Sequence, residues 1–178
     1  MNTRRIIGVS LVAMSMGWLA GCGRSDKEPT TLQRKEAATL VSEAQFALQL
    51  KDLARAEGLL TKATELSWDS GKVWVDLGSV RVRLGKKDAA RTAYLAALKA
   101  YENEAAKPAD PKAGNGPDVA PWMQQVYVLA LLGRVDDARS ALAKAQKKFP
   151  ESRAVRTFVE QKQIEKMIAD PSFKLIAL

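Results

Sequence analysis

Cys22 carries the most distinctive chemistry in this chain, because it is the only cysteine and the chain contains no histidine. A lone thiol cannot form a disulfide within the chain. Without histidine, the commonest general base and the commonest metal ligand are both missing. The sequence therefore excludes cysteine–histidine catalysis and cysteine–histidine metal clusters. Cys22 is left as a free thiol, a small apolar residue, or a site of covalent attachment.

The residues before Cys22 form the pattern of an export signal. Two arginines near the start precede an apolar stretch over about residues 6–19, and two small residues follow before the cysteine. The run Leu19-Ala20-Gly21-Cys22 resembles the lipobox of bacterial lipoproteins. This resemblance implies that residues 1–21 are a signal peptide cleaved before Cys22, and that the new N-terminal cysteine carries acyl chains such as palmitate.

Two alternatives for this segment are disfavoured. The apolar stretch has about 14 residues, whereas a bilayer-spanning helix needs about 20. The pair Arg4-Arg5 also occurs in twin-arginine export signals, but it serves equally as an ordinary positive n-region. Gly23 follows the cysteine in place of the aspartate that favours inner-membrane retention in enteric bacteria. The resemblance thus implies the periplasmic face of the outer membrane.

The charge pattern is that of a solvated surface. Without residues 1–21 the chain keeps a net charge of +6, and its basic and acidic residues are interspersed. Attraction to anionic headgroups or acidic partners is the alternative reading. Because no basic stripe with interleaved aromatic residues occurs, we expect no binding of nucleic acid.

Catalysis is not expected either. Asp136 and Asp137 are adjacent acids, but their position at the start of a predicted helix explains them as charges that favour a helix N-terminus. The chain has no glycine-rich phosphate loop and no nucleophile motif. We therefore expect no enzyme activity, no small-molecule substrate, no metal, and no cofactor beyond a covalent lipid on Cys22.

The remainder of the chain predicts a tether followed by an all-α domain. Residues 22–34 are polar and include Pro29, which is typical of a flexible linker. From residue 35 to 170 apolar residues recur three and four positions apart, as in amphipathic helices.

Three similar turns divide this helical region. They lie at residues 50–56, 84–90 and 132–138, and each begins with leucine and ends with alanine. The first two turns are 34 residues apart, and the third follows 48 residues later. A 34-residue period is that of tetratricopeptide repeats, each a pair of antiparallel helices.

The residues at these positions resemble the tetratricopeptide family. The pattern of tryptophan, leucine-glycine, alanine and aromatic residue is carried in the middle unit by Trp74, Leu77, Gly78, Ala90 and Tyr94. The third unit has Trp122, Gly133, Ala138, Leu142, Ala145 and Pro150, and the weaker first unit has Leu40, Ala44, Ala56, Leu60 and Ala63. The resemblance implies an α-solenoid of three helical hairpins, with repeats at about residues 37–70, 71–104 and 119–152.

The small residues have a physical role beside the family pattern. Alanine or glycine is expected where helices must approach closely, with Tyr94 among the bulky residues that fill the space. Gly85 and Gly133 suit the left-handed conformation that ends a helix before a tight turn. Lys51 occupies the same place in the first unit, so we expect that turn to be strained or differently shaped.

Three further segments are predicted. Residues 105–118 contain three prolines and two glycines and form an insertion loop that either contacts a partner or is disordered. Residues 152–169 form a capping helix over the open end of the stack. The apolar tail at residues 171–178 either folds back on that helix or docks into a partner.

Stacked hairpins present a concave surface lined by the first helix of each unit. Counting from the repeat frame, we expect it to show Val41, Gln45, Gln49, Lys72, Val75, Ser79, Arg83, Met123, Tyr127 and Leu131. The expected first helix of the third unit, which begins near Trp122, is apolar on nearly all sides. Either the chain's own insertion loop, capping helix and tail cover it, or Met123, Tyr127 and Leu131 form a docking surface for a partner helix or peptide.

The sequence therefore predicts a lipid-anchored protein whose repeats bind other proteins of the cell envelope. The favoured role is a scaffold or adaptor in the assembly of envelope complexes. The alternative is a stable accessory subunit of one such complex.

Overall fold

The structure, a computed structural model, describes residues 28–108 and 118–178. The expected signal peptide, residues 22–27 of the expected tether with Cys22, and residues 109–117 of the expected insertion loop lie outside the described residues. The described residues are all-α, as predicted. The helices are α1 (Thr31–Gln49), α2 (Leu53–Leu66), α3 (Gly71–Arg83), α4 (Lys87–Ala106), α5 (Ala120–Leu131), α6 (Val135–Lys148), α7 (Arg153–Glu160), α8 (Gln163–Ala169) and α9 (Pro171–Lys174).

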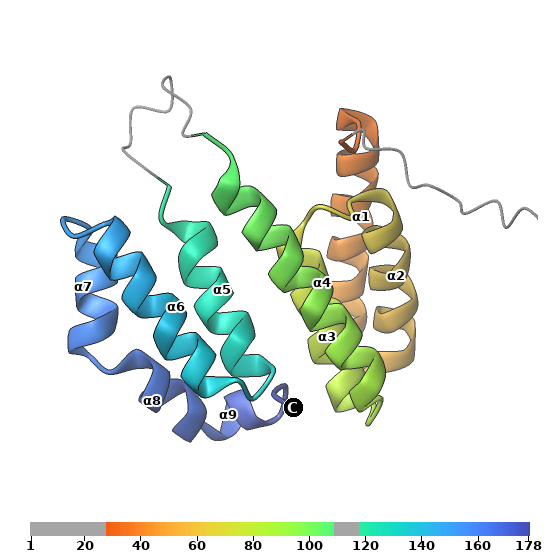
Figure 1. Cartoon of the computed structure of the whole chain (residues 1–178). Helices are drawn as coiled ribbons and strands as arrows, with labels where there is room; N and C mark the ends of the chain where they lie inside the picture. Colours follow the sequence, from red (N-terminus) through yellow and green to blue (C-terminus); the bar gives the residue numbers. More distant parts are fainter. Residues whose placement is uncertain (1–27, 109–117) are drawn as a thin grey trace, which may run out of the picture.

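The first six helices form three antiparallel hairpins. Helix α1 packs on α2, α3 on α4, and α5 on α6, while α2–α3 and α4–α5 contacts join neighbouring hairpins. Figure 1 shows the hairpins side by side in chain order, with α7 beyond α6 and with α8 and α9 running back below the ends of α6 and α5. The α-solenoid of three helical hairpins is therefore confirmed.

The three hairpin turns share one geometry. Lys51, Gly85 and Gly133 have φ of 59°, 76° and 71°. The amide that follows each of them bonds back five residues, as from Lys86 N to Arg81 O at 2.8 Å. This is the Schellman ending of a helix. Lys51 adopts the same left-handed conformation as the two glycines, although a side chain makes that conformation unfavourable.

The small residues lie where helices touch. Seven of the expected alanine spacers, from all three hairpins, have no exposed surface: Ala44, Ala56, Ala63, Ala90, Ala97, Ala138 and Ala145. Gly78 of α3 lies against the ring of Tyr94, so a Cβ added there would come within 2.3 Å of Cε1. The close approach of α3 and α4 therefore requires glycine at this position.

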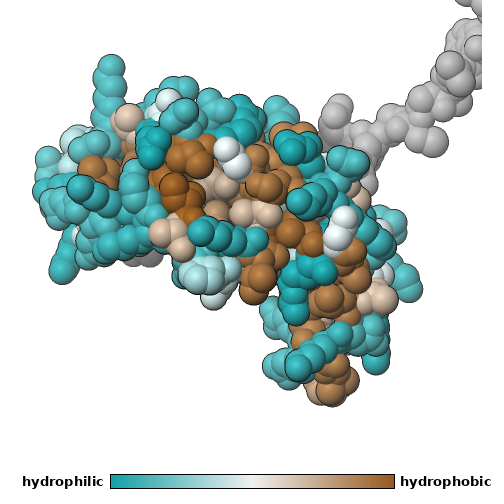
Figure 2. Space-filling model, turned by 90° about the horizontal axis from the view of Figure 1, so that it is seen from below, coloured by the Kyte–Doolittle hydropathy of each residue, from teal (hydrophilic) through white to brown (hydrophobic). Residues whose placement is uncertain are grey.

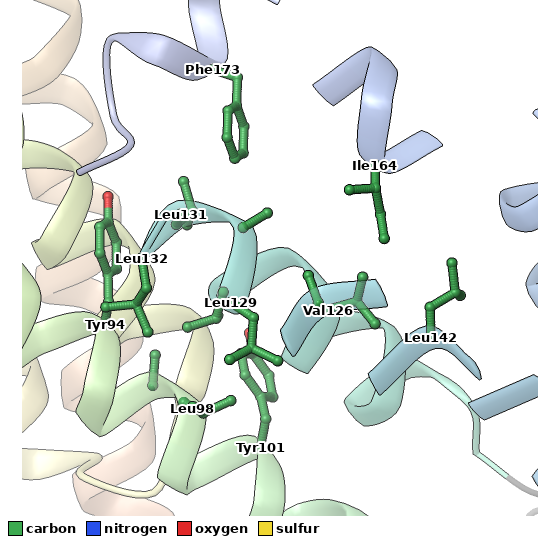
Figure 3. Close-up of a cluster of buried hydrophobic side chains, with 14 of the residues drawn as sticks. Tyr94, Leu98, Tyr101, Val126, Leu129, Leu131, Leu132, Leu142, Ile164 and Phe173 are labelled. Carbon is green, nitrogen blue, oxygen red and sulfur yellow. The ribbon is translucent and has the colours of Figure 1, made fainter. Parts of the chain in front are cut away.

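Buried side chains form two clusters. One joins α1, α2 and α3 with Ala93 of α4, and the other extends from α4 to the C-terminal segment. In Figure 3, Tyr94, Leu98 and Tyr101 on α4 lie beside Leu129 and Leu132, and Phe173 and Ile164 approach from the C-terminal helices. The C-terminal residues thus belong to the same core as the last hairpins.

Two element boundaries differ from those expected. Helix α1 begins at Thr31, inside the expected tether of residues 22–34, because Thr30 and Gln33 form a reciprocal capping box. The expected capping helix at 152–169 is two short helices, α7 and α8, which meet at Lys162 with φ of 50°. The left-handed residue breaks the helix and allows α8 to contact α5 as well as α6.

The packing at Gly78 leads to a test with a matched control. Gly78→Ala is expected to destabilise the fold by about 1–3 kcal/mol, because the new methyl group overlaps the ring of Tyr94. Gly58 is also helical, but nothing lies within 4 Å of an added Cβ, so Gly58→Ala is expected to stabilise by about 0.5–1 kcal/mol. Urea unfolding of both variants measures the difference. Equal effects of the two substitutions would contradict the account of this contact.

Candidate functional site: the groove between α1 and α3

Side chains from the first and second hairpins enclose a small cavity, which we call the α1–α3 groove. Its volume is about 130 Å³, and it is lined by Val41, Ala44, Gln45, Leu48, Leu60, Asp76, Ser79, Val80, Arg83 and Ile176. Four predicted surface residues meet here: Val41 and Gln45 from α1, and Ser79 and Arg83 from α3. The lining therefore combines apolar side chains with the amide of Gln45 and the charged groups of Asp76 and Arg83.

Ile176 shows that the tail reaches this groove. The segment 171–178 begins with α9, where Asp170 accepts a hydrogen bond from Ser172 N at 2.7 Å. Phe173 is buried and packs edge-on against Tyr127, with ring centroids 5.9 Å apart. Beyond it, Leu178 N donates to Leu131 O at 2.9 Å. The tail folds back, but it lies on α5 and in the α1–α3 groove as well as against the capping helices.

The hydroxyl of Tyr94 joins the tail to the hairpins. It donates a hydrogen bond to the backbone oxygen of Ile176, and its oxygen lies 3.3 Å from Ser79 Oγ. Burial raises the pKa of Tyr94 to about 12, since removal of water disfavours the phenolate. The neutral hydroxyl is therefore the form that holds the tail at ordinary pH.

Helix α5 contributes less open surface than the sequence predicts. Leu131 has no exposed surface, so its side chain is core and only its carbonyl oxygen meets the tail. Tyr127 is half-buried under Phe173, and Met123 packs half-buried against the same core cluster. Helix α8 and the tail cover α5. A docking surface formed by Met123, Tyr127 and Leu131 would need these side chains to be uncovered, so the structure favours cover by the chain's own segments.

The other predicted groove residues lie apart from the cavity. Gln49 is exposed, and Val75 is half-buried against the core. Lys72 lies at the start of α3 and pairs with Asp76, with Nζ and Oδ2 2.8 Å apart. Its side chain lines a different, open cleft at the other end of α3.

That second cleft is polar and lies where the described chain begins. Arg34 donates two hydrogen bonds to Asp69, at 3.1 and 2.7 Å. Lys107, at the end of α4, pairs with Glu28 at 2.7 Å, and the hydrogen bond from Lys107 lowers the pKa of that carboxyl. These ion pairs are exposed, so they fix the path of the chain more than they stabilise the fold.

The structure also places the acids that were weighed as catalytic groups. At the start of α6, Asp137 pairs with Arg134 at 2.7 Å and Asp136 with Arg139 at 3.0 Å, all on the surface. Among residues 28–108 and 118–178, no group of three or more acidic, histidine or cysteine side chains is placed to hold a metal. In the same described ranges, the helices lack the length and hydropathy that crossing a bilayer demands.

Sequence reasoning missed two features of the groove. The sequence places Ile176 in an apolar tail that either folds back on the capping helix or docks into a partner. It predicts Tyr94 only as a bulky residue that fills space between helices. A signal for Tyr94 existed, because a buried tyrosine hydroxyl normally finds a hydrogen-bond partner. Nothing in the sequence identified the Ile176 carbonyl, 82 residues away, as that partner.

Comparison with known families identifies two of the helical pairs. Residues 71–104, which include all of α3 and most of α4, match the tetratricopeptide repeat family. Residues 122–152, which include most of α5 and all of α6, match the tetratricopeptide repeat family independently. No curated protein matches the chain.

The buried tyrosines provide a spectroscopic test of this packing. The chain has three tyrosines; burial raises the pKa of Tyr94 and of Tyr101 to about 12, and also raises that of Tyr127. Ultraviolet titration of the folded protein should therefore show phenolate absorbance rising above pH 10, with most of the change near pH 12.

The same shifts fix the sign of a stability effect. Between pH 10 and 12 the unfolded chain releases these phenolic protons while the folded chain keeps them, so stability falls as pH rises through this range. In denaturant all three tyrosines should titrate near pH 10. A folded protein that titrates like the denatured one would contradict the burial of these rings.

Proposed function

We propose that this tetratricopeptide repeat protein is a lipid-anchored scaffold that binds other proteins in the bacterial cell envelope. Tetratricopeptide repeats are protein interaction modules built from stacked helical pairs. The observation that supports a binding role here is the α1–α3 groove, an apolar cavity with Gln45, Asp76 and Arg83 among its lining residues. Such a lining provides apolar contact together with hydrogen bonds that fix the orientation of a bound segment.

The surface outside the groove supports the same role. Figure 2 shows that hydrophobic side chains gather in a band across the face seen from below, with hydrophilic residues around them. The exposed large apolar residues of the described chain include Phe46 and Leu50. Apolar side chains that gather on one face within a polar border are typical of protein interaction sites.

The anchor in this proposal is the acyl group that the lipobox pattern predicts on Cys22. Glu28 lies six positions after Cys22, so covalent geometry limits the distance between the two residues to about 20 Å. Because Glu28 pairs with Lys107, the end of the stack that carries the C-terminus of α4 would face the membrane. We propose the periplasmic face of the outer membrane, on the grounds of the lipobox and of Gly23.

A stable accessory subunit of one envelope complex is the second candidate. The observation that favours it is the outer side of α1, where Leu32 and Phe46 are 74% and 56% exposed, followed by Leu50 at 61%. A permanent partner would cover these side chains. In either role we propose that the protein is not an enzyme and needs no cofactor besides its lipid.

Photo-crosslinking on membranes tests the binding role. A photoreactive residue at Gln45 or Arg83 should form adducts with envelope proteins, because both side chains line the α1–α3 groove. The matched control is Arg91, which is exposed on α4 away from that cavity. Several adducts would indicate an adaptor, and one stoichiometric adduct would indicate a subunit. Adducts at none of the three positions, or the same adducts at all three, would contradict a partner-binding groove.

Replacing Cys22 tests the anchor. The variant Cys22→Ser should lose palmitate labelling, because it lacks the cysteine that the lipobox pattern marks for acylation. Its helical circular dichroism should be unchanged, because Cys22 lies outside the described fold. Ser25→Ala, three residues away, serves as the control and should keep its palmitate labelling. Palmitate labelling of Cys22→Ser at the wild-type level would reject lipid anchoring at this residue.

A further inference from the structure

The α1–α3 groove is already occupied in part by the chain's own segment 171–178. We propose that this tail is an internal competitor for the groove, and that the partner it excludes is an apolar peptide segment of the same chemistry. That chemistry is one helical turn with an aromatic residue, then a branched aliphatic residue three positions later. The inference rests on the proposed protein-binding function and specifies which partners fit and how access is controlled.

The contacts of the tail are those of a bound peptide. Phe173 packs on Tyr127 of α5, and Ile176 packs against the core cluster of α4 and α5 and is one of the residues that line the cavity between α1 and α3. Two hydrogen bonds to backbone groups of the tail fix its path: the Tyr94 hydroxyl donates to the Ile176 carbonyl, and Leu178 N donates to Leu131 O. Side-chain pockets together with backbone hydrogen bonds are how proteins recognise short peptide segments.

The tail is attached over only part of its length. Phe173 is buried, but Leu175 is 68% exposed, and residues 176–178 are half-buried. Helix α9 has only four residues, so it gains little stability from its own hydrogen bonds. A segment held by a few contacts at its two ends opens more readily than the hairpins beneath it.

The groove also keeps space beside the tail. The cavity of about 130 Å³ remains with Ile176 in place, and Gln45, Asp76 and Arg83 contribute polar groups to its lining. A partner with a longer apolar side chain at the position of Ile176 would fill more of this cavity. Its backbone could use the Tyr94 hydroxyl and the Leu131 carbonyl that the tail releases.

A labelled peptide of residues 170–178 is the probe for this competition. Fluorescence anisotropy measures its binding to the full-length chain and to the full-length variant Ile176→Asp, whose own tail is held less tightly because it loses the branched aliphatic side chain that packs against the core. We expect the variant to bind the peptide at least tenfold more tightly than the wild type. Leu175→Asp is the matched control, since the same change at the adjacent exposed residue should leave binding at the wild-type level.

Two further variants distinguish a change in peptide binding from a defect in folding. Tyr94→Phe keeps the ring against Gly78 and removes only the hydroxyl that holds the tail, so its affinity for the peptide should lie between those of the wild type and Ile176→Asp. Adding Val41→Asp to Ile176→Asp should abolish peptide binding, because Val41 lines the cavity. Circular dichroism confirms the helical fold of each variant.

The proposal is overturned if the wild type, Ile176→Asp and Tyr94→Phe bind the peptide equally, or if none of them binds it. It is also overturned if Val41→Asp leaves binding intact. Envelope crosslinks at Gln45 without peptide binding would leave the scaffold function standing and reject the competition. Peptide binding without any crosslinked partner would reject the scaffold function and keep the competition.

Discussion

The contact between Gly78 and Tyr94 is the constraint on which the rest of this structure depends. The tyrosine ring occupies the space that a side chain at Gly78 would need, which sets how closely α3 and α4 approach. The same residue lies at the junction of the hairpins and the tail, since its hydroxyl meets both Ser79 and the Ile176 carbonyl. One buried aromatic residue thus couples hairpin packing to the state of the α1–α3 groove.

The two ends of the helical stack differ in how far their apolar side chains are covered. At the C-terminal end, α7 and α8 cover the last hairpin, and the tail returns across α5 to the groove. At the N-terminal end, ion pairs such as Arg34 with Asp69 direct the chain, while apolar side chains such as Phe46 remain exposed. This asymmetry agrees with the proposed role, in which the chain is tethered at one end and binds its partner along the first hairpins.

Features with a local signal could be predicted from the sequence, and features that depend on distant contacts could not. Alanine and glycine at repeat spacing predicted three hairpins, because each close helix contact needs small residues at fixed positions. The break at Lys162 has no glycine or proline to mark it, since a lysine adopts the left-handed conformation there. The place of Ile176 depends on a residue 82 positions away, which periodicity cannot reveal.

The occupied groove is tested most directly by amide hydrogen exchange at Leu178. In the folded chain this amide donates to Leu131 O at 2.9 Å, so it should exchange roughly tenfold or more slowly than in an isolated peptide of residues 170–178. Equal exchange in the protein and the peptide would show that the tail does not lie on α5. In that case the α1–α3 groove would be open in the free protein, and the coupling through Tyr94 would be absent.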